Sequence, residues 1–131
     1  MNPDLKELAA IRIKKAEETL HDAGILFGSG SYFGAVNRIY YTVFYAARAL
    51  LAIKGLDSPK HSGVIALFNK DFVKTGEVSK DLGKILSDMF EIRSAGDYED
   101  GKIFSKDEVG DYLIKSETFL AGIKQVLQKL P

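Results

Sequence analysis

The chain has 131 residues, of which 46% are hydrophobic and 27% are charged. This length suits one domain with a single core, and this composition argues against intrinsic disorder. Eighteen basic and eighteen acidic residues cancel, so an RNA-binding patch has to be local. There is no cysteine and there are only two histidines, which excludes disulfides and the usual zinc sites. We therefore expect no metal and no cofactor.

Local charge is uneven along the chain. Residues 38–80 contain seven Lys/Arg and three Asp/Glu, whereas residues 91–111 contain three and seven. The longest apolar segment is interrupted by Arg48 and falls short of the roughly 18 residues that a membrane span requires. The chain begins with a charged helix instead of the apolar core of a signal peptide. These features predict a soluble, cytoplasmic protein.

Two long helices are predicted in the first half of the chain. Asn2 is a suitable cap for the first, over residues 3–28, and Ser31 for the second, over residues 32–54. The first helix has one apolar stripe, but the second is apolar on every side, which predicts that it lies in the core. Small side chains on the second helix would let neighbouring helices approach closely: Ala35, Ala46, Ala47, Ala49 and Ala52.

A short helix and a fourth long one are predicted next. Ser58 and Pro59 form a cap and first-turn pair for the short helix, which Gly76 ends. Ser79 can cap the fourth helix, whose apolar stripe leads to Arg93. Residues 94–101 are predicted to form a polar segment in which the chain leaves that helix.

The last helix has the best-defined start. Ser105 and Glu108 make a capping box, with Phe104 and Val109 as the hydrophobic staple around it. Its apolar positions repeat at intervals of four and three, as in the seam of a bundle. The elements together predict an all-α, up-and-down bundle of four to five helices in a single domain over residues 1–131.

The predicted core helix carries polar groups that are costly to bury unless they are paired. Helical spacing places Asn37 and Tyr41 on one side, together with Phe44 and Arg48, and Arg38 on another. One interpretation is a polar layer that only fixes helix register. The other is a site in which Asn and Arg groups donate hydrogen bonds to a phosphate or a base while tyrosine rings stack.

Two further groups could carry chemistry. Arg93 and Asp97 are four residues apart, so they form either an intrahelical ion pair or, with Tyr98, an anion-binding site at the end of the helix. Lys60 and His61 lie at the start of the short helix. A histidine there is usually a surface or cap residue, but His61 is also the one plausible acid/base group in the middle of the chain.

A series of motifs, taken in order, resembles the HEPN domain family. The resemblance extends from about Ala9 to Leu127 and is closest to small stand-alone prokaryotic HEPN proteins. It rests on four segments: residues 37–51 (NRIYYTVFYAARALL), residues 60–65 (KHSGVI), residues 72–76 (FVKTG) and residues 93–100 (RSAGDYED).

The resemblance implies a helical bundle that forms a homodimer and has a minimal nucleotidyltransferase as partner, in pairs that behave as toxin–antitoxin systems. It also implies a possible ribonuclease, because many HEPN proteins cleave RNA without metal through an Arg and a His that are separated by four to six residues. Here Arg93 matches the Arg, but Tyr98 stands where the His is expected. An ordinary tyrosine is a poor base at neutral pH. In some HEPN pairs the partner nucleotidylates a tyrosine near this motif, which makes Tyr98 a possible modification target.

We therefore expect a protein that binds nucleotide or RNA and acts with a nucleotidyltransferase. The nucleotide- or RNA-binding residues we expect are Asn37, Arg38, Tyr41, Lys60, Arg93, Asp97 and Tyr98. The first alternative is a metal-independent endoribonuclease toxin, with Arg93 and His61 as catalytic residues. The second alternative is a structural interaction module without a ligand.

Overall fold

A computed structural model describes residues 2–130, except for the side chain of Tyr98. The regular elements in this part of the chain are all helices, with no strand, as predicted. None of its helices is both long and apolar enough to cross a membrane. The elements are α1 (Pro3–Gly28), α2 (Tyr32–Ile53), α3 (His61–Phe68), the π-helical turn η1 (Asn69–Val73), α4 (Lys80–Tyr98) and α5 (Lys106–Lys129).

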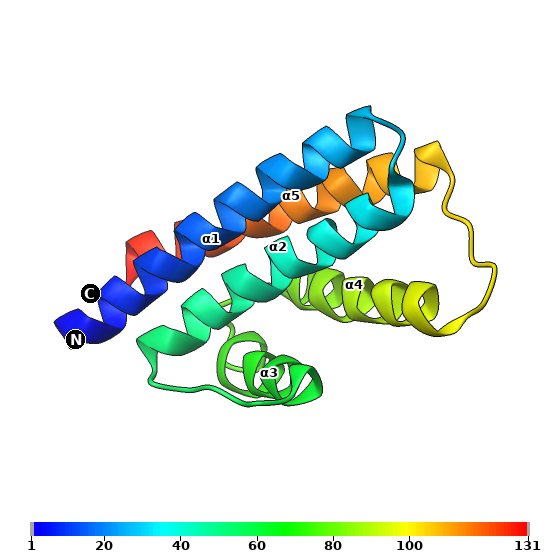
Figure 1. The fold of residues 1–131 in the computed structure, drawn as a ribbon. Coiled ribbons are helices and arrows are strands. Elements are labelled where there is room, and N and C mark those ends of the chain that lie inside the picture. Colours follow the sequence, from blue (N-terminus) through cyan, green and yellow to red (C-terminus); the bar gives the residue numbers. More distant parts are fainter. Residues whose placement is uncertain (1, 131) are drawn as a thin grey trace.

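Helix α2 is the centre of the bundle. It contacts α1, α5, α4 and α3, and Figure 1 shows α1 and α5 running along it on one side while α4 and α3 lie on the other. Thirteen of its residues are buried, including all five of the alanines noted in the sequence. Because an alanine adds little bulk to a helix surface, neighbouring helices can pack closely on α2. The apolar character of α2 on every side is thus explained by its central position.

The helix starts follow the predicted caps at three places. Asn2 Oδ1 accepts a hydrogen bond from the Asp4 N–H at 2.9 Å, and Ser79 Oγ accepts one from the Leu82 N–H at 3.2 Å. Ser105 makes the complete capping box. Ser31 stands at the N-cap of α2, but its side chain makes no cap hydrogen bond.

The start of α3 differs from the prediction. The helix begins at His61, after Lys60 as N-cap residue, and not at Pro59 after Ser58. The Asp57 carboxylate binds Arg48 at 2.8 Å and also accepts the Ser58 N–H at 2.8 Å. Because these contacts hold residues 57–58 outside helical geometry, the helix begins later than the cap motif suggests.

The end of α4 also differs, because the helix continues past Arg93 to Tyr98. The predicted polar exit at residues 94–101 is wrong over its first half. Gly96 does not break the helix; it lies where a Cβ would be 3.0 Å from two ring carbons of Phe104. The glycine therefore allows a close contact, and the left-handed residue that turns the chain is Gly101, with φ of 77°. The extra turn places Asp97 on the same helix as Arg93.

Candidate functional site

Arg93 of α4 lies against the first half of α2. Its Nη2 donates to the Tyr41 hydroxyl oxygen at 3.4 Å, a long hydrogen bond. Its guanidinium carbon is 5.3 Å from the centre of the Tyr40 ring and 5.5 Å from that of Tyr41. Both distances are within the range of cation–π attraction. The side chain keeps 22% exposure, so this cation is held by aromatic rings and still reaches solvent.

A second arginine approaches the same tyrosine from α2 itself. The Arg38 guanidinium carbon is 5.1 Å from the centre of the Tyr41 ring. Asn37 Oδ1 accepts hydrogen bonds from Arg38 Nη2 at 2.8 Å and Nε at 3.1 Å. Asn37 also borders a narrow crevice together with Arg93 and Asp97. The end of α4 thus lies beside the Asn37–Arg38 pair.

Asp97 is the nearest counter-charge to Arg93. Its Oδ2 is 2.8 Å from Arg93 Nε, one helical turn away, with side-chain exposures of 30% and 22%. The Nε atom is buried, yet it makes no hydrogen bond. The two observations agree if the charges touch while the N–H points away from the oxygen. The ion pair is therefore close but poorly aligned.

His61 joins this group from α3. Its Nδ1 is 2.9 Å from the Tyr40 hydroxyl, and its ring centre is 4.3 Å from that of Phe44. Partial burial lowers the pKa of His61, and the positive charges of Arg93 and Arg48 lower it further. The imidazole is consequently neutral at neutral pH.

A cavity of about 440 Å³ opens beside His61 and is lined by Phe44, Arg48, Asp57, Ser58, Pro59 and His61. Arg48 pairs with Asp57 at 2.8 Å, and Arg12 of α1 reaches the same carboxylate at 3.4 Å. Burial raises the pKa of Asp57, but hydrogen bonds from Arg48 and the Ser58 N–H, with the charges of both arginines, outweigh this and lower it. Arg48 thus has a well-placed counter-ion, which it shares with Arg12, whereas the counter-ion of Arg93 is poorly aligned.

The structure brings together six of the eight predicted site residues, namely Asn37, Arg38, Tyr41, His61, Arg93 and Asp97. Lys60 is exposed at the N-cap of α3. The side chain of Tyr98 lies outside the described part. Sequence reasoning missed Tyr40, which is 1% exposed and connects His61 with Arg93. Its spacing from Phe44 indicates one helix face, but pairing with His61 depends on the tertiary fold.

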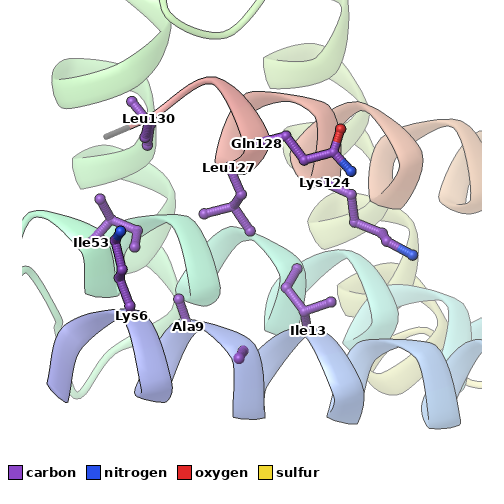
Figure 2. A pocket seen from close by; sticks show the side chains of 9 residues that line it. Lys6, Ala9, Ile13, Ile53, Lys124, Leu127, Gln128 and Leu130 are labelled. Carbon is purple, nitrogen blue, oxygen red and sulfur yellow. The ribbon is translucent and has the colours of Figure 1, made fainter. Parts of the chain in front are cut away.

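A separate groove of about 400 Å³ lies at the other end of α2, where the two ends of the chain meet. Figure 2 shows Ile13, Ile53 and Leu127 lining it, with Lys6 and Lys124 beside them. Between Asn37 and Ile53 the axis of α2 is roughly 24 Å long at 1.5 Å per residue. The groove is therefore distinct from the group of side chains around Arg93. Its lining is mainly apolar.

Among the described residues, no three His, Asp or Glu side chains are arranged as a metal site. The polar groups around Arg93 are two guanidinium cations, an amide, an imidazole, a carboxylate and hydroxyl groups on aromatic rings. Such a set suits an anion that carries a flat ring.

Comparisons with known proteins agree with the motifs. A family model described as "HEPN domain" matches residues 9–126. The chain is 47% identical to a "UPF0332 protein" of Thermotoga maritima over 117 residues, or 89% of each chain. It is 35% identical over 130 residues to "Putative toxin MJ0605" of Methanocaldococcus jannaschii, covering 99% of this chain and 96% of that protein. "Putative toxin MJ0142" of the same organism is 40% identical over 116 residues, covering 88% and 78%. The chain belongs to the HEPN domain family.

Proposed function

We propose that this HEPN protein binds nucleotide or RNA at the Arg93 cluster and acts as the toxin-like member of a pair with a minimal nucleotidyltransferase. We define the Arg93 cluster as Asn37, Arg38, Tyr40, Tyr41, His61, Arg93 and Asp97.

The observation that carries the binding proposal is the contact between Arg93 and the two tyrosine rings of α2. A guanidinium attracts phosphate strongly, and it does so most effectively when its own counter-ion is badly placed. Arg38 adds a second guanidinium close to the ring of Tyr41. Two cations around a partly exposed aromatic ring suit a ligand with a phosphate and a base.

The names of two relatives support the toxin-like part of the proposal, since both are called putative toxins. The proposed partner is the one that the HEPN resemblance implies, namely a minimal nucleotidyltransferase. The open reading frame beside this gene provides a direct check. A short nucleotidyltransferase there, co-purifying with this chain, supports the pair; a chain that never co-purifies with it contradicts the pair.

A second candidate function is metal-independent RNA cleavage. The observation in its favour is that His61 and Arg93 both contact the Tyr40 ring, which places an acid/base group near an anion-binding group. The hydrogen bond between Tyr40 and His61 weighs against it, because it occupies one of the two imidazole nitrogens.

The binding proposal is tested with a fluorescein-labelled single-stranded RNA of twelve mixed nucleotides and, separately, with AMP. Fluorescence anisotropy at low and high salt measures the RNA affinity, and calorimetry measures the AMP affinity. We expect saturable binding of at least one probe that weakens as salt rises, since phosphate contacts release counterions. Absence of binding for both probes would refute the proposal.

A further inference from the structure

The hydroxyl of Tyr40 requires a hydrogen-bond acceptor. Tyr40 is only 1% exposed, and burial raises the pKa of its phenol well above the usual value, so the hydroxyl keeps its hydrogen. A buried hydroxyl hydrogen without an acceptor is costly. Among the described side chains, Nδ1 of His61 at 2.9 Å is the acceptor available to it.

This contact decides where His61 carries its hydrogen. A neutral imidazole has one nitrogen that donates and one that accepts. If Nδ1 accepts from Tyr40, the hydrogen sits on Nε2. The opposite tautomer would point an Nδ1–H at the Tyr40 oxygen and leave the phenol hydrogen without a partner. The doubly protonated ring also carries a hydrogen on Nδ1 and would likewise leave the phenol hydrogen without an acceptor.

The charged groups around His61 also oppose its protonation. Arg93 approaches from α4 and Arg48 from α2, and both are positive. Lys60 precedes His61 on the chain. Asp57, the one carboxylate that lines the adjoining cavity, is bound by Arg48 and Arg12. The ring centre of Tyr41 is 5.9 Å from that of His61.

We propose that Tyr40 fixes His61 as the neutral Nε2–H tautomer, and that this N–H donates a hydrogen bond to a phosphate oxygen of the ligand bound at Arg93. Tyr40 is then a positioning residue and His61 a ligand-binding donor. The second half of the statement rests on the proposed nucleotide or RNA binding, whereas the tautomer does not. A histidine held in this way cannot accept a proton at Nε2 and is therefore not a general base there.

Long-range 1H–15N NMR spectra of the 15N-labelled chain show which ring nitrogen carries the hydrogen. The chain has two histidines, so the variant His21→Gln leaves His61 as the single histidine signal. We expect a protonated Nε2 and an unprotonated Nδ1, with a titration midpoint below the usual histidine pKa of about 6.5. A protonated Nδ1, or a midpoint at or above the usual value, would overturn the proposal.

Two further variants test the role of Tyr40. Tyr40→Phe removes the hydroxyl that stabilises the neutral ring, so the pKa of His61 should rise. Tyr45→Phe is the matched control, since it removes a hydroxyl from the same helix, and Tyr45 packs against Tyr41 and Phe44 and not against His61. It should leave the His61 titration unchanged. An identical titration in Tyr40→Phe would contradict the assignment, and the wild-type tautomer remains decisive if this variant fails to fold.

The donor role is measured with the same labelled RNA. Gln offers an N–H near the position of Nε2 and Phe does not, so His61→Gln should bind within about twofold of wild type and His61→Phe about fivefold more weakly. Addition of RNA should also shift the Nε2 signal. Equal loss in both variants, or an unmoved Nε2 signal when RNA is bound, would overturn the donor role. The expected tautomer without binding of either the RNA or AMP would instead mean that the proposed function is wrong.

Discussion

Arg93 Nε lies 2.8 Å from Asp97 Oδ2, yet this buried N–H makes no hydrogen bond. The charge-assisted hydrogen bond that usually strengthens such a contact is missing. An ion pair between neighbouring turns of an exposed helix contributes only a few tenths of a kcal/mol. Arg93 is therefore held mainly by the rings of Tyr40 and Tyr41, and its charge is poorly compensated. This arrangement suits anion binding better than helix stabilisation.

Replacing Arg93 should separate a role in anion binding from a role in helix stabilisation. We expect Arg93→Ala to abolish binding of the labelled RNA while it lowers stability by less than about 1 kcal/mol. Lys84→Ala is the control, because Lys84 forms an i,i+4 ion pair with Asp88 on the same helix at 73% exposure. Lys84→Ala should change neither the RNA affinity nor the stability. A collapse of the melting temperature in Arg93→Ala would assign Arg93 a structural role instead.

Asp97 competes with an anionic ligand for Arg93. Asp97→Asn keeps the size of the side chain and removes its charge, so we expect RNA to bind more tightly by a small factor, about two- to fivefold at low salt. The gain should shrink as salt screens the charge. Weaker binding in Asp97→Asn would mean that the carboxylate itself contacts the ligand.

The capping box at the start of α5 gives a prediction about stability. Ser105 Oγ accepts the Glu108 N–H at 3.1 Å, and Glu108 accepts the Ser105 N–H at 3.0 Å. Ser105→Ala should cost about 1 kcal/mol of unfolding free energy in urea denaturation. Ser31→Ala provides a matched control, because Ser31 occupies an N-cap without making the cap hydrogen bond. Equal losses in the two variants would show that the Ser105 hydrogen bond is not what stabilises α5.

Dimerisation stays a prediction, and exposed apolar residues indicate where to test it. Phe33 is 54% exposed and Ile103 is 84% exposed, and both line a surface cavity together with the buried Phe104. Phe33 and Phe104 also border the crevice beside Arg93. We expect light scattering to show a dimer at micromolar concentration.

Ile103→Asp should convert this dimer to a monomer, because a dimer interface here would have to bury the new charge. Ile114→Asp places the same charge on α5, at a residue that is 63% exposed, and should leave the dimer intact. A monomeric wild-type chain would rule out the dimer, and an unaffected Ile103→Asp dimer would place the interface elsewhere.

Much of the fold could be predicted from local patterns. The caps at Asn2, Ser79 and Ser105 depend on short-range hydrogen bonds, so the sequence identifies them reliably. The start of α3 could not be found in this way, because Asp57 is held by Arg48 and Arg12, which are distant in sequence. The predicted helix end near Gly96 is wrong for a similar reason, since only the approach of Phe104 explains why a glycine lies inside the helix.

The cluster shows the same division. Asn37, Arg38 and Tyr41 were suggested by their spacing on one helix, and Arg93 and Asp97 by theirs on another. Only the tertiary structure shows that the two sets meet, through the contact of Arg93 with Tyr41. Tyr40 was missed because nothing in its helix distinguishes a tyrosine that packs in the core from one that orients a histidine. The partner, His61, comes from a third element.

The final prediction concerns catalysis. Cleavage of RNA through its 2′-hydroxyl needs a group that takes up a proton near neutral pH beside the group that stabilises the phosphate charge. His61 lies in the right region, but Tyr40 occupies its Nδ1, and burial together with the charges of Arg93 and Arg48 lowers its pKa. We therefore expect the purified chain to degrade mixed RNA weakly or not at all in the presence of chelator, as judged by gel electrophoresis.

Any residual cleavage should depend on His61 and disappear in His61→Ala, whereas His21→Ala, at the exposed histidine of α1, should have no effect. Rapid chelator-resistant cleavage that survives His61→Ala would prove this expectation wrong. The proton would then have to move through another group of the cluster. Asp97 is one such group, because its carboxylate already lies beside the Arg93 guanidinium. Loss of cleavage in Asp97→Asn but not in His61→Ala would identify it as that base.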